Sequence, residues 1–190
     1  MESIIEKAKA KFLEMVSDFG SDPYHLLPHV PEAEKWARFM LNKYPQANEE
    51  IVLLAVWLHD LGHYPIPTDI DHAVRSEERA KEFLEHENCG SEKMNEVLHC
   101  VRSHRCRDVM PKSLEAKIMA FVDSASHMTN STYFDMAKDD KDKKENFMVY
   151  AKMERDLRNL SSFPEIQNEL TGLYNAWQNL IKEYEKIDLV

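Results

Sequence analysis

The sequence predicts an all-α fold, and three observations favour it. The chain of 190 residues contains only 4 glycines against 10 methionines, and its stretches rich in Glu, Lys, Ala and Leu favour helix over sheet. Apolar residues recur at helical spacing, as they do from Ile4 to Phe19. No stretch has a convincing strand pattern, and no internal repeat is found. We therefore expect one domain over residues 1–190, built as a multi-helix bundle.

The first two predicted helices are delimited by glycine and proline. The apolar series that begins at Ile4 is followed by Gly20, which indicates a helix end. The stretch 21–44 is a turn that leads into a second helix, with Pro31 near the first helical turn. His29 would then lie at or just before the start of this helix.

The third predicted helix is the most apolar part of the chain. Asn48 is placed to cap its start, and residues 51–61 are apolar on nearly all sides except at the polar pair His59 and Asp60. We expect this helix to be central and buried, and Gly62 to end it.

Further helices are expected along the rest of the chain. Residues 71–90 and 91–106 predict two helices, and 114–128 predict another that carries Asp123 inside its apolar stripe. The tract 138–145 balances four positive against four negative charges, which is typical of a solvated helix face or a mobile loop. Two amphipathic helices, split near Pro164, follow it. A core of about residues 20–130 would thus carry C-terminal helices from 131–190.

Charge and composition exclude several classes of protein. A formal charge of −10 and a pI of about 5.4 argue against long nucleic acid as a partner. Cys89, Cys100 and Cys106 form no CxxC pattern and fit free thiols in a reducing compartment. The N-terminus lacks the apolar core of a signal peptide, and no apolar run reaches the roughly 20 residues that span a bilayer. We expect a soluble, cytoplasmic protein with no membrane partner.

The pair His59-Asp60 is the strongest chemical signal, because a buried carboxylate needs compensation. A metal ion is one solution, and a buried ion pair with Arg or Lys is the other. Neighbouring helical side chains point about 100° apart, so both could reach one ion. Asp123 is a similar acid within an apolar stripe, either a second ligand or a hydrogen-bond acceptor in helix packing.

Other histidines leave alternatives open. His63 follows Asp60 by three residues, so it lies either beside the metal, where it could contact a phosphate or protonate a leaving oxygen, or at the helix end as a cap. His72 and His104 are either ligands of a second ion or surface histidines. Four arginines are solvated or paired, unless one clamps a phosphate: Arg75, Arg102, Arg105 and Arg107.

These motifs together resemble the HD-domain metal-dependent phosphohydrolase superfamily. The matching stretches are LPHV with His29, AVWLHDLGH with His59 and Asp60, and KIMAFVDSASHM with Asp123. Their order and approximate spacing agree over roughly residues 20–130. The long insertions of the deoxynucleoside triphosphate hydrolases and the GYP signature of the cyclic dinucleotide enzymes are missing, so neither substrate is transferred.

The resemblance implies an HD-type bundle whose four motif residues hold one divalent ion. The segments DHAVRSEERAKEFL and EVLHCVRSHR are similar to those that supply extra ligands in two-ion members, which places His72 and His104 in these positions. Nitrogen and carboxylate ligands suit Mn, Fe, Co, Ni, Zn or Mg. The implied reaction is hydrolysis of a small phosphate ester, such as a nucleotide, by a metal-activated water, with His63 as proton donor.

Two alternatives keep the fold and change the function. A pair of irons could activate oxygen, or the metal could only stabilise a non-catalytic sensor module. Substrate specificity is expected from the loop 64–69 and from the segment 105–112, both of which would border the cleft. The last amphipathic helices could pack within one chain or form a homodimer.

Overall fold

The computed structural model describes residues 2–65, 69–139 and 147–187, and within these ranges it is all-helical, without strands. The predicted all-α class is therefore confirmed. Along the described chain, nine α-helices and two 3₁₀ turns follow one another: α1 (Ile4–Phe19), α2 (Leu26–Lys43), α3 (Glu49–Leu58), η1 (Leu61–His63), α4 (His72–His86), α5 (Ser91–Ser103), α6 (Leu114–Thr129), α7 (Thr132–Asp139), α8 (Phe147–Asn159), η3 (Leu160–Ser162) and α9 (Pro164–Glu185).

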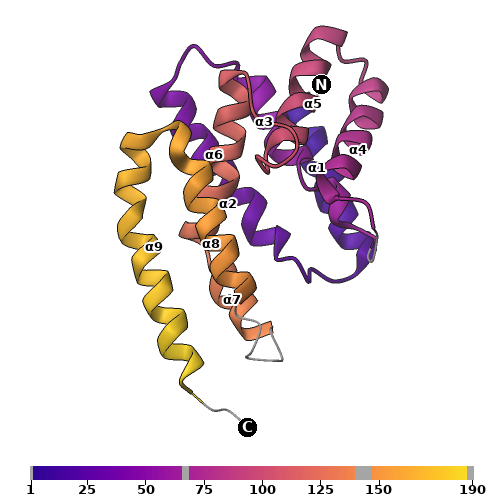
Figure 1. Cartoon of the computed structure of the whole chain (residues 1–190). Helices are drawn as coiled ribbons and strands as arrows, with labels where there is room; N and C mark the ends of the chain where they lie inside the picture. Colours follow the sequence, from indigo (N-terminus) through magenta and orange to yellow (C-terminus); the bar gives the residue numbers. More distant parts are fainter. Residues whose placement is uncertain (1, 66–68, 140–146, 188–190) are drawn as a thin grey trace.

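Helix α6 joins the two parts of the bundle. It contacts α2, α3 and α5 on one side and α7, α8 and α9 on the other, and α8 also packs against α9 (Figure 1). Helix α1 lies against α3, and α4 packs on α5 and η1. Within the described ranges, no helix is both long and apolar enough to span a bilayer.

Side-chain caps fix several helix starts. Ser3, Asn48, Asp71 and Ser113 each accept a hydrogen bond from a backbone N–H in the first turn of the helix that follows. Gly20 ends α1 with a φ of 77°, a conformation that glycine adopts at little cost. The predicted cap at Asn48 and the predicted helix end at Gly20 are confirmed.

Helix α2 begins earlier than its proline predicts. The Asp22 carboxylate accepts hydrogen bonds from the N–H groups of Leu26 (2.9 Å) and Leu27 (2.8 Å), so the helix starts at Leu26. Pro31 therefore lies inside the helix, not at its first turn. The expectation that His29 precedes or opens this helix is wrong, because His29 belongs to the helix and is 3% exposed.

The turn η1, just after α3, packs closely against α4. Helix α3 stops at Leu58, and η1 follows after His59 and Asp60. At Gly62 an added Cβ would lie 2.3 Å from the His72 carbonyl oxygen, so only glycine lets η1 come this close to α4. The Gly62 N–H also donates to Ser76 Oγ at 2.8 Å. Gly62 thus places His63 and the start of α4 side by side.

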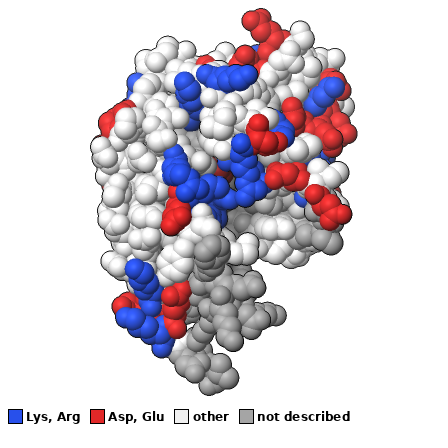
Figure 2. All heavy atoms as spheres, viewed as in Figure 1, with Lys and Arg blue, Asp and Glu red and all other residues white. Residues whose placement is uncertain are grey.

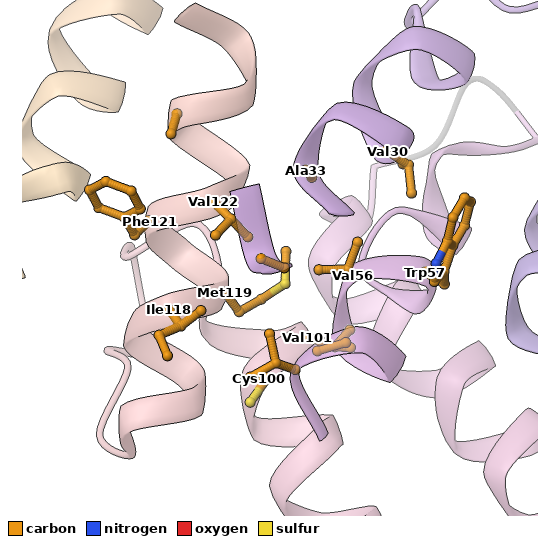
Figure 3. Close-up of a cluster of buried hydrophobic side chains, with 14 of the residues drawn as sticks. Val30, Ala33, Val56, Trp57, Cys100, Val101, Ile118, Met119, Phe121 and Val122 are labelled. Atoms are coloured by element: carbon orange, nitrogen blue, oxygen red, sulfur yellow. The ribbon is translucent and has the colours of Figure 1, made fainter. Parts of the chain in front are cut away.

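The core lies where four helices meet. Every residue of α3 from Ile51 to Leu58 is buried, as predicted for a central helix. Figure 3 shows side chains of α2, α3, α5 and α6 converging on one another, with Val56 and Val101 among them. Burial of such side chains contributes roughly 1.5–3 kcal/mol each, so this apolar cluster holds the four helices in place.

Two predicted segments fall partly outside the described residues. These are the charged tract 138–145, beyond residue 139, and the loop 64–69, at residues 66–68. Helix α7 (Thr132–Asp139) was not predicted as a separate element. Helices α8 and α9 separate at Pro164, as expected.

Candidate metal centre

The structure brings all seven predicted site residues to one place beside the end of α3. They come from different elements: His29 (α2), His59 and Asp60 (after α3), His63 (η1), His72 (first residue of α4), His104 (after α5) and Asp123 (α6). His59 is fully buried, and Asp123, the most exposed of the four motif residues, is 9% exposed. The reading of His72 and His104 as surface histidines is wrong, because both rings face this cluster.

Three buried residues form what we call the inner group: His29, His59 and Asp123. The Nε2 atoms of His29 and His59 are 3.2 Å apart. Asp123 Oδ1 lies 3.3 Å from His29 Nε2 and 3.6 Å from His59 Nε2. All three side chains thus direct a nitrogen or carboxylate oxygen to one point, as ligands of a single ion would.

A second set, which we call the outer group, consists of His63, His72 and His104. Asp60 joins it to the inner group, since its Oδ2 lies 3.2 Å from His59 Nε2 while its Oδ1 lies 3.3 Å from His63 Nε2 and 3.7 Å from His72 Nε2. His104 Nε2 is 3.3 Å from His72 Nε2. The Asp60 carboxylate therefore stands between two clusters of nitrogen atoms.

Backbone carbonyls fix the proton position of two rings. His59 Nδ1 lies 2.8 Å from the Val56 oxygen, and His104 Nδ1 lies 2.6 Å from the Val101 oxygen. A carbonyl oxygen only accepts, so each Nδ1 carries the proton and donates it. Each Nε2 is left to face the cluster with a lone pair.

Ser126 fixes the position of the proton on the His29 ring in the same way. Its hydroxyl donates to the Asp123 carbonyl oxygen at 2.7 Å, so it accepts from His29 Nδ1 at 2.9 Å. In the inner group two Nε2 lone pairs then face each other at 3.2 Å, an arrangement that needs a cation or a proton between them. The donor set of imidazole nitrogens and carboxylate oxygens fits a divalent metal ion.

The electrostatics of the inner group favour positive charge. Burial lowers the pKa of His59, but Asp60 and Asp123 together raise it to about 10. Burial raises the pKa of Asp60, but His59 and His63 outweigh it and hold that pKa well below its usual range. The site thus retains a proton, and a metal ion would compete for the same position.

No Lys or Arg among the described residues forms an ion pair with Asp60 or Asp123, whose ion-pair partners are histidines. The buried ion pair with Arg or Lys, one of the two readings of Asp60, is therefore absent from the described part of the chain.

A network behind His29 was missed by sequence reasoning. The His127 ring stacks on the His29 ring, with centroids 4.4 Å apart and planes 4° apart. Asp156, fully buried, lies 3.2 Å from His127 Nδ1, 3.1 Å from Lys152 Nζ and 2.9 Å from the Tyr133 hydroxyl that donates to it. The available signal was Asp156 itself, which lies in the buried apolar stripe formed by Val149 and Met153 of α8 and by Leu160 just after it.

A cavity of about 410 Å³ opens directly onto both groups, within the size range of small-molecule sites. Its walls include Tyr24 and Met148 as well as the basic residues Arg105, Lys152 and Arg155. Figure 2 shows Lys and Arg side chains gathered around a hollow in the middle of this face. Of the four arginines considered from the sequence, Arg105 lines the cavity, and it pairs with Asp71.

Comparison with known proteins agrees with this geometry. The family model of the HD domain matches residues 27–128, which is more than half of the chain and includes all seven site residues. Neither the curated proteins nor the solved structures contain a significant match. The chain therefore belongs to the HD domain family, whose members are typically metal-dependent phosphohydrolases.

Proposed function

We propose that this protein is a metal-dependent phosphohydrolase that cleaves a small phosphate ester, such as a nucleotide. The observation that carries the proposal is the pair of nitrogen clusters joined by Asp60 at the floor of a cavity. His29, His59, Asp60 and Asp123 would hold one divalent ion. Asp60, His72 and His104 would hold a second. When bound, such ions neutralise phosphoryl oxygens and lower the pKa of water.

His63 is the proposed proton donor to the leaving oxygen. Its Nε2 is 3.3 Å from Asp60 Oδ1, and its side chain is 17% exposed, so the ring reaches both the site and the cavity. The same geometry would let His63 bind the outer ion instead, since Asp60, His63 and His72 form one candidate ligand set. Metal content separates the roles, because a proton donor can be replaced without loss of an ion.

The cavity supports a substrate with an anionic end and an apolar part. Arg105 lies beside the outer group, with Nη1 3.5 Å from His72 Nδ1, and is placed to contact a phosphoryl oxygen. Tyr24, Leu26, Met136 and Val149 supply apolar surface to the same cavity. The Tyr24 ring, 42% exposed, could stack on a nucleobase.

The test combines metal analysis with a substrate screen. We expect the purified 190-residue chain to hold one or two ions and to hydrolyse phosphate mono- or diesters with Mn, Co, Ni, Zn, Fe or Mg. His63→Gln should lower kcat by about 10²–10⁴-fold, the range for loss of a general acid, with metal content unchanged. His86→Ala is the matched control, because the His86 side chain is 84% exposed.

Two results would contradict this proposal and favour a different function. Fully loaded protein that turns over no ester, but whose melting temperature falls on chelation, would indicate a structural metal in a sensor module. Iron-loaded protein that consumes oxygen together with an organic substrate would indicate an oxygenase built on the same ligands.

A further inference from the structure

Helix α8 lies outside the matched HD region, yet it forms one wall of the cavity. Lys152, Arg155 and Asn159 all line this space. They are three and four positions apart, so they share one face of the helix. The chain thus adds two basic side chains to a site whose ligands all come from residues 29–123.

Asp156 and His127 hold Lys152 at the cavity without occupying all the hydrogen-bond donors of the Lys152 ammonium group. Lys152 Nζ lies 3.1 Å from Asp156 Oδ2 and 3.1 Å from His127 Nδ1. An ammonium group has three donors, so one remains for a ligand. The Lys152 side chain is 15% exposed, and it has given up most of its contact with water.

Arg155 has fewer polar contacts within the protein than Lys152. Among the described residues, its guanidinium makes one ion pair, 3.5 Å from Asp156 Oδ1, and no hydrogen bond. A guanidinium carries five N–H donors in a planar fork, which suits two oxygens of a phosphate or carboxylate. One buried carboxylate thus faces two cations, which leaves a positive surplus on this wall.

Two further arginines, Arg105 in the cavity wall and Arg107 beside it, add positive charge. Arg107 lies near Arg105, since both pair with Asp71, and repulsion by Arg105 lowers the pKa of Arg107. Its acidic partner, Asp71, is 3.9 Å away and is shared with Arg105. Figure 2 shows Lys and Arg side chains gathered around the hollow of this face, on a protein whose formal charge is −10. An anion in the opening would relieve the repulsion.

We propose that Lys152 and Arg155 bind a second anionic group of the substrate, separate from the phosphate at the metal centre. The preferred substrates would then carry two anionic groups, and α8 would set this specificity. The inference that substrates carry two anionic groups rests on the proposed function. The inference that Lys152 and Arg155 bind an anion does not depend on that function. The second group is a phosphate or a carboxylate, which share the oxygens that a guanidinium recognises.

Binding of inorganic anions to the full chain tests the proposal without turnover. After treatment with EDTA, and with folding checked by circular dichroism, the protein is titrated calorimetrically with tripolyphosphate, phosphonoacetate and orthophosphate. We expect the two probes with more than one anionic group to bind more tightly than orthophosphate. Arg155→Gln should weaken them by at least about tenfold, as expected for loss of a charge-assisted hydrogen bond.

Arg158→Gln is the matched control, since Arg158 is exposed on the same helix and does not line the cavity. A larger loss of tripolyphosphate binding than of phosphonoacetate binding in Arg155→Gln would identify the second group as phosphate, and the reverse as carboxylate. An equal loss in both arginine variants would mean a general charge effect and would overturn the proposal. So would unchanged binding of all three probes in Arg155→Gln. If the phosphohydrolase proposal alone were wrong, metal-loaded protein would turn over no ester, but the metal-free protein would still bind the anions.

Discussion

The inner and outer groups share Asp60 but differ in how firmly their ligands are held. In the inner group His29 and His59 are 3% and 0% exposed, and each Nδ1 donates to a fixed acceptor. In the outer group the side chains of His63 and His72 are 17% and 20% exposed. His72 Nδ1 faces Arg105, which can only donate. The inner side chains, and His104 of the outer group, are thus preorganised, whereas His63 and His72 depend on how η1 and α4 are held.

This difference predicts two unequal metal sites. A preorganised site loses less entropy and needs no change of tautomer when an ion binds, so the inner site should bind more tightly. The outer site should fill at higher metal concentration and empty first on chelation.

Asp60→Asn should have the largest effect because Asp60 serves both groups. We expect loss of bound metal and a fall in kcat/KM of at least about a thousandfold, as when a group essential to catalysis is removed. Elemental analysis and the ester screen measure both. Asp18→Asn, on the exposed surface of α1, should change neither. If Asp60→Asn retained two ions per chain, the bridging position of this carboxylate would be wrong.

Replacing one histidine in each group compares the two sites directly. His59→Ala should lower the affinity for the tightly bound ion by more than about 100-fold. This loss exceeds the range expected for groups that only support a ligand. His72→Ala should leave that ion in place and remove only the weak one. Metal titration against a chelator of known affinity measures both. Loss of the tight ion in His72→Ala alone would reverse the assignment.

The sequence predicted which residues converge at the candidate site better than it predicted their surroundings. His59, Asp60 and Asp123 stand out because each is polar within an apolar stripe, and that signal needs no structure. The same signal existed at Asp156 but is weaker, since the neighbouring residues of α8 are charged. The stacking of His127 on His29 could not be predicted, because it depends on how α6 meets α2.

Helix boundaries were predicted well where the cap is local and poorly where it is not. Asn48 caps the helix that begins at the next residue, so the start of α3 follows from the sequence. The start of α2 depends on Asp22, four residues before Leu26, and was misplaced. Gly62 was expected to end a helix, but its role is to permit contact with α4, which only the packed structure reveals.

Gly62→Ala should act on the outer group. The added Cβ would meet backbone atoms of His72 and Ser76 at 2.3 and 2.5 Å, so η1 must move from α4. We expect unfolding free energy to fall by about 1–3 kcal/mol, as in overpacked cores, and the weak ion to be lost. Thermal and denaturant unfolding measure the first, and metal titration the second.

Gly172→Ala is the control for that change, because a Cβ there meets nothing within 4 Å and the residue lies in α9. Alanine in a helix is more stable than glycine by about 1 kcal/mol, so this variant should be as stable as the natural protein or more so. A Gly62→Ala variant that kept both ions and full stability would show that η1 and α4 do not need this close approach.

Ser126→Ala should have the smallest effect and should act on the inner group only. Without the hydroxyl, His29 Nδ1 loses its acceptor and the proton can move to Nε2, which then cannot bind an ion. We expect affinity for the tight ion to fall by about tenfold, the lower end for loss of a supporting hydrogen bond, while the weak ion is unaffected. Ser103→Ala is the control, since Ser103 is equally buried but its hydroxyl donates to the His99 backbone oxygen of α5 and not to a histidine ring. Equal losses of affinity in both variants would mean that the fixed tautomer of His29 does not distinguish the inner group from the outer one.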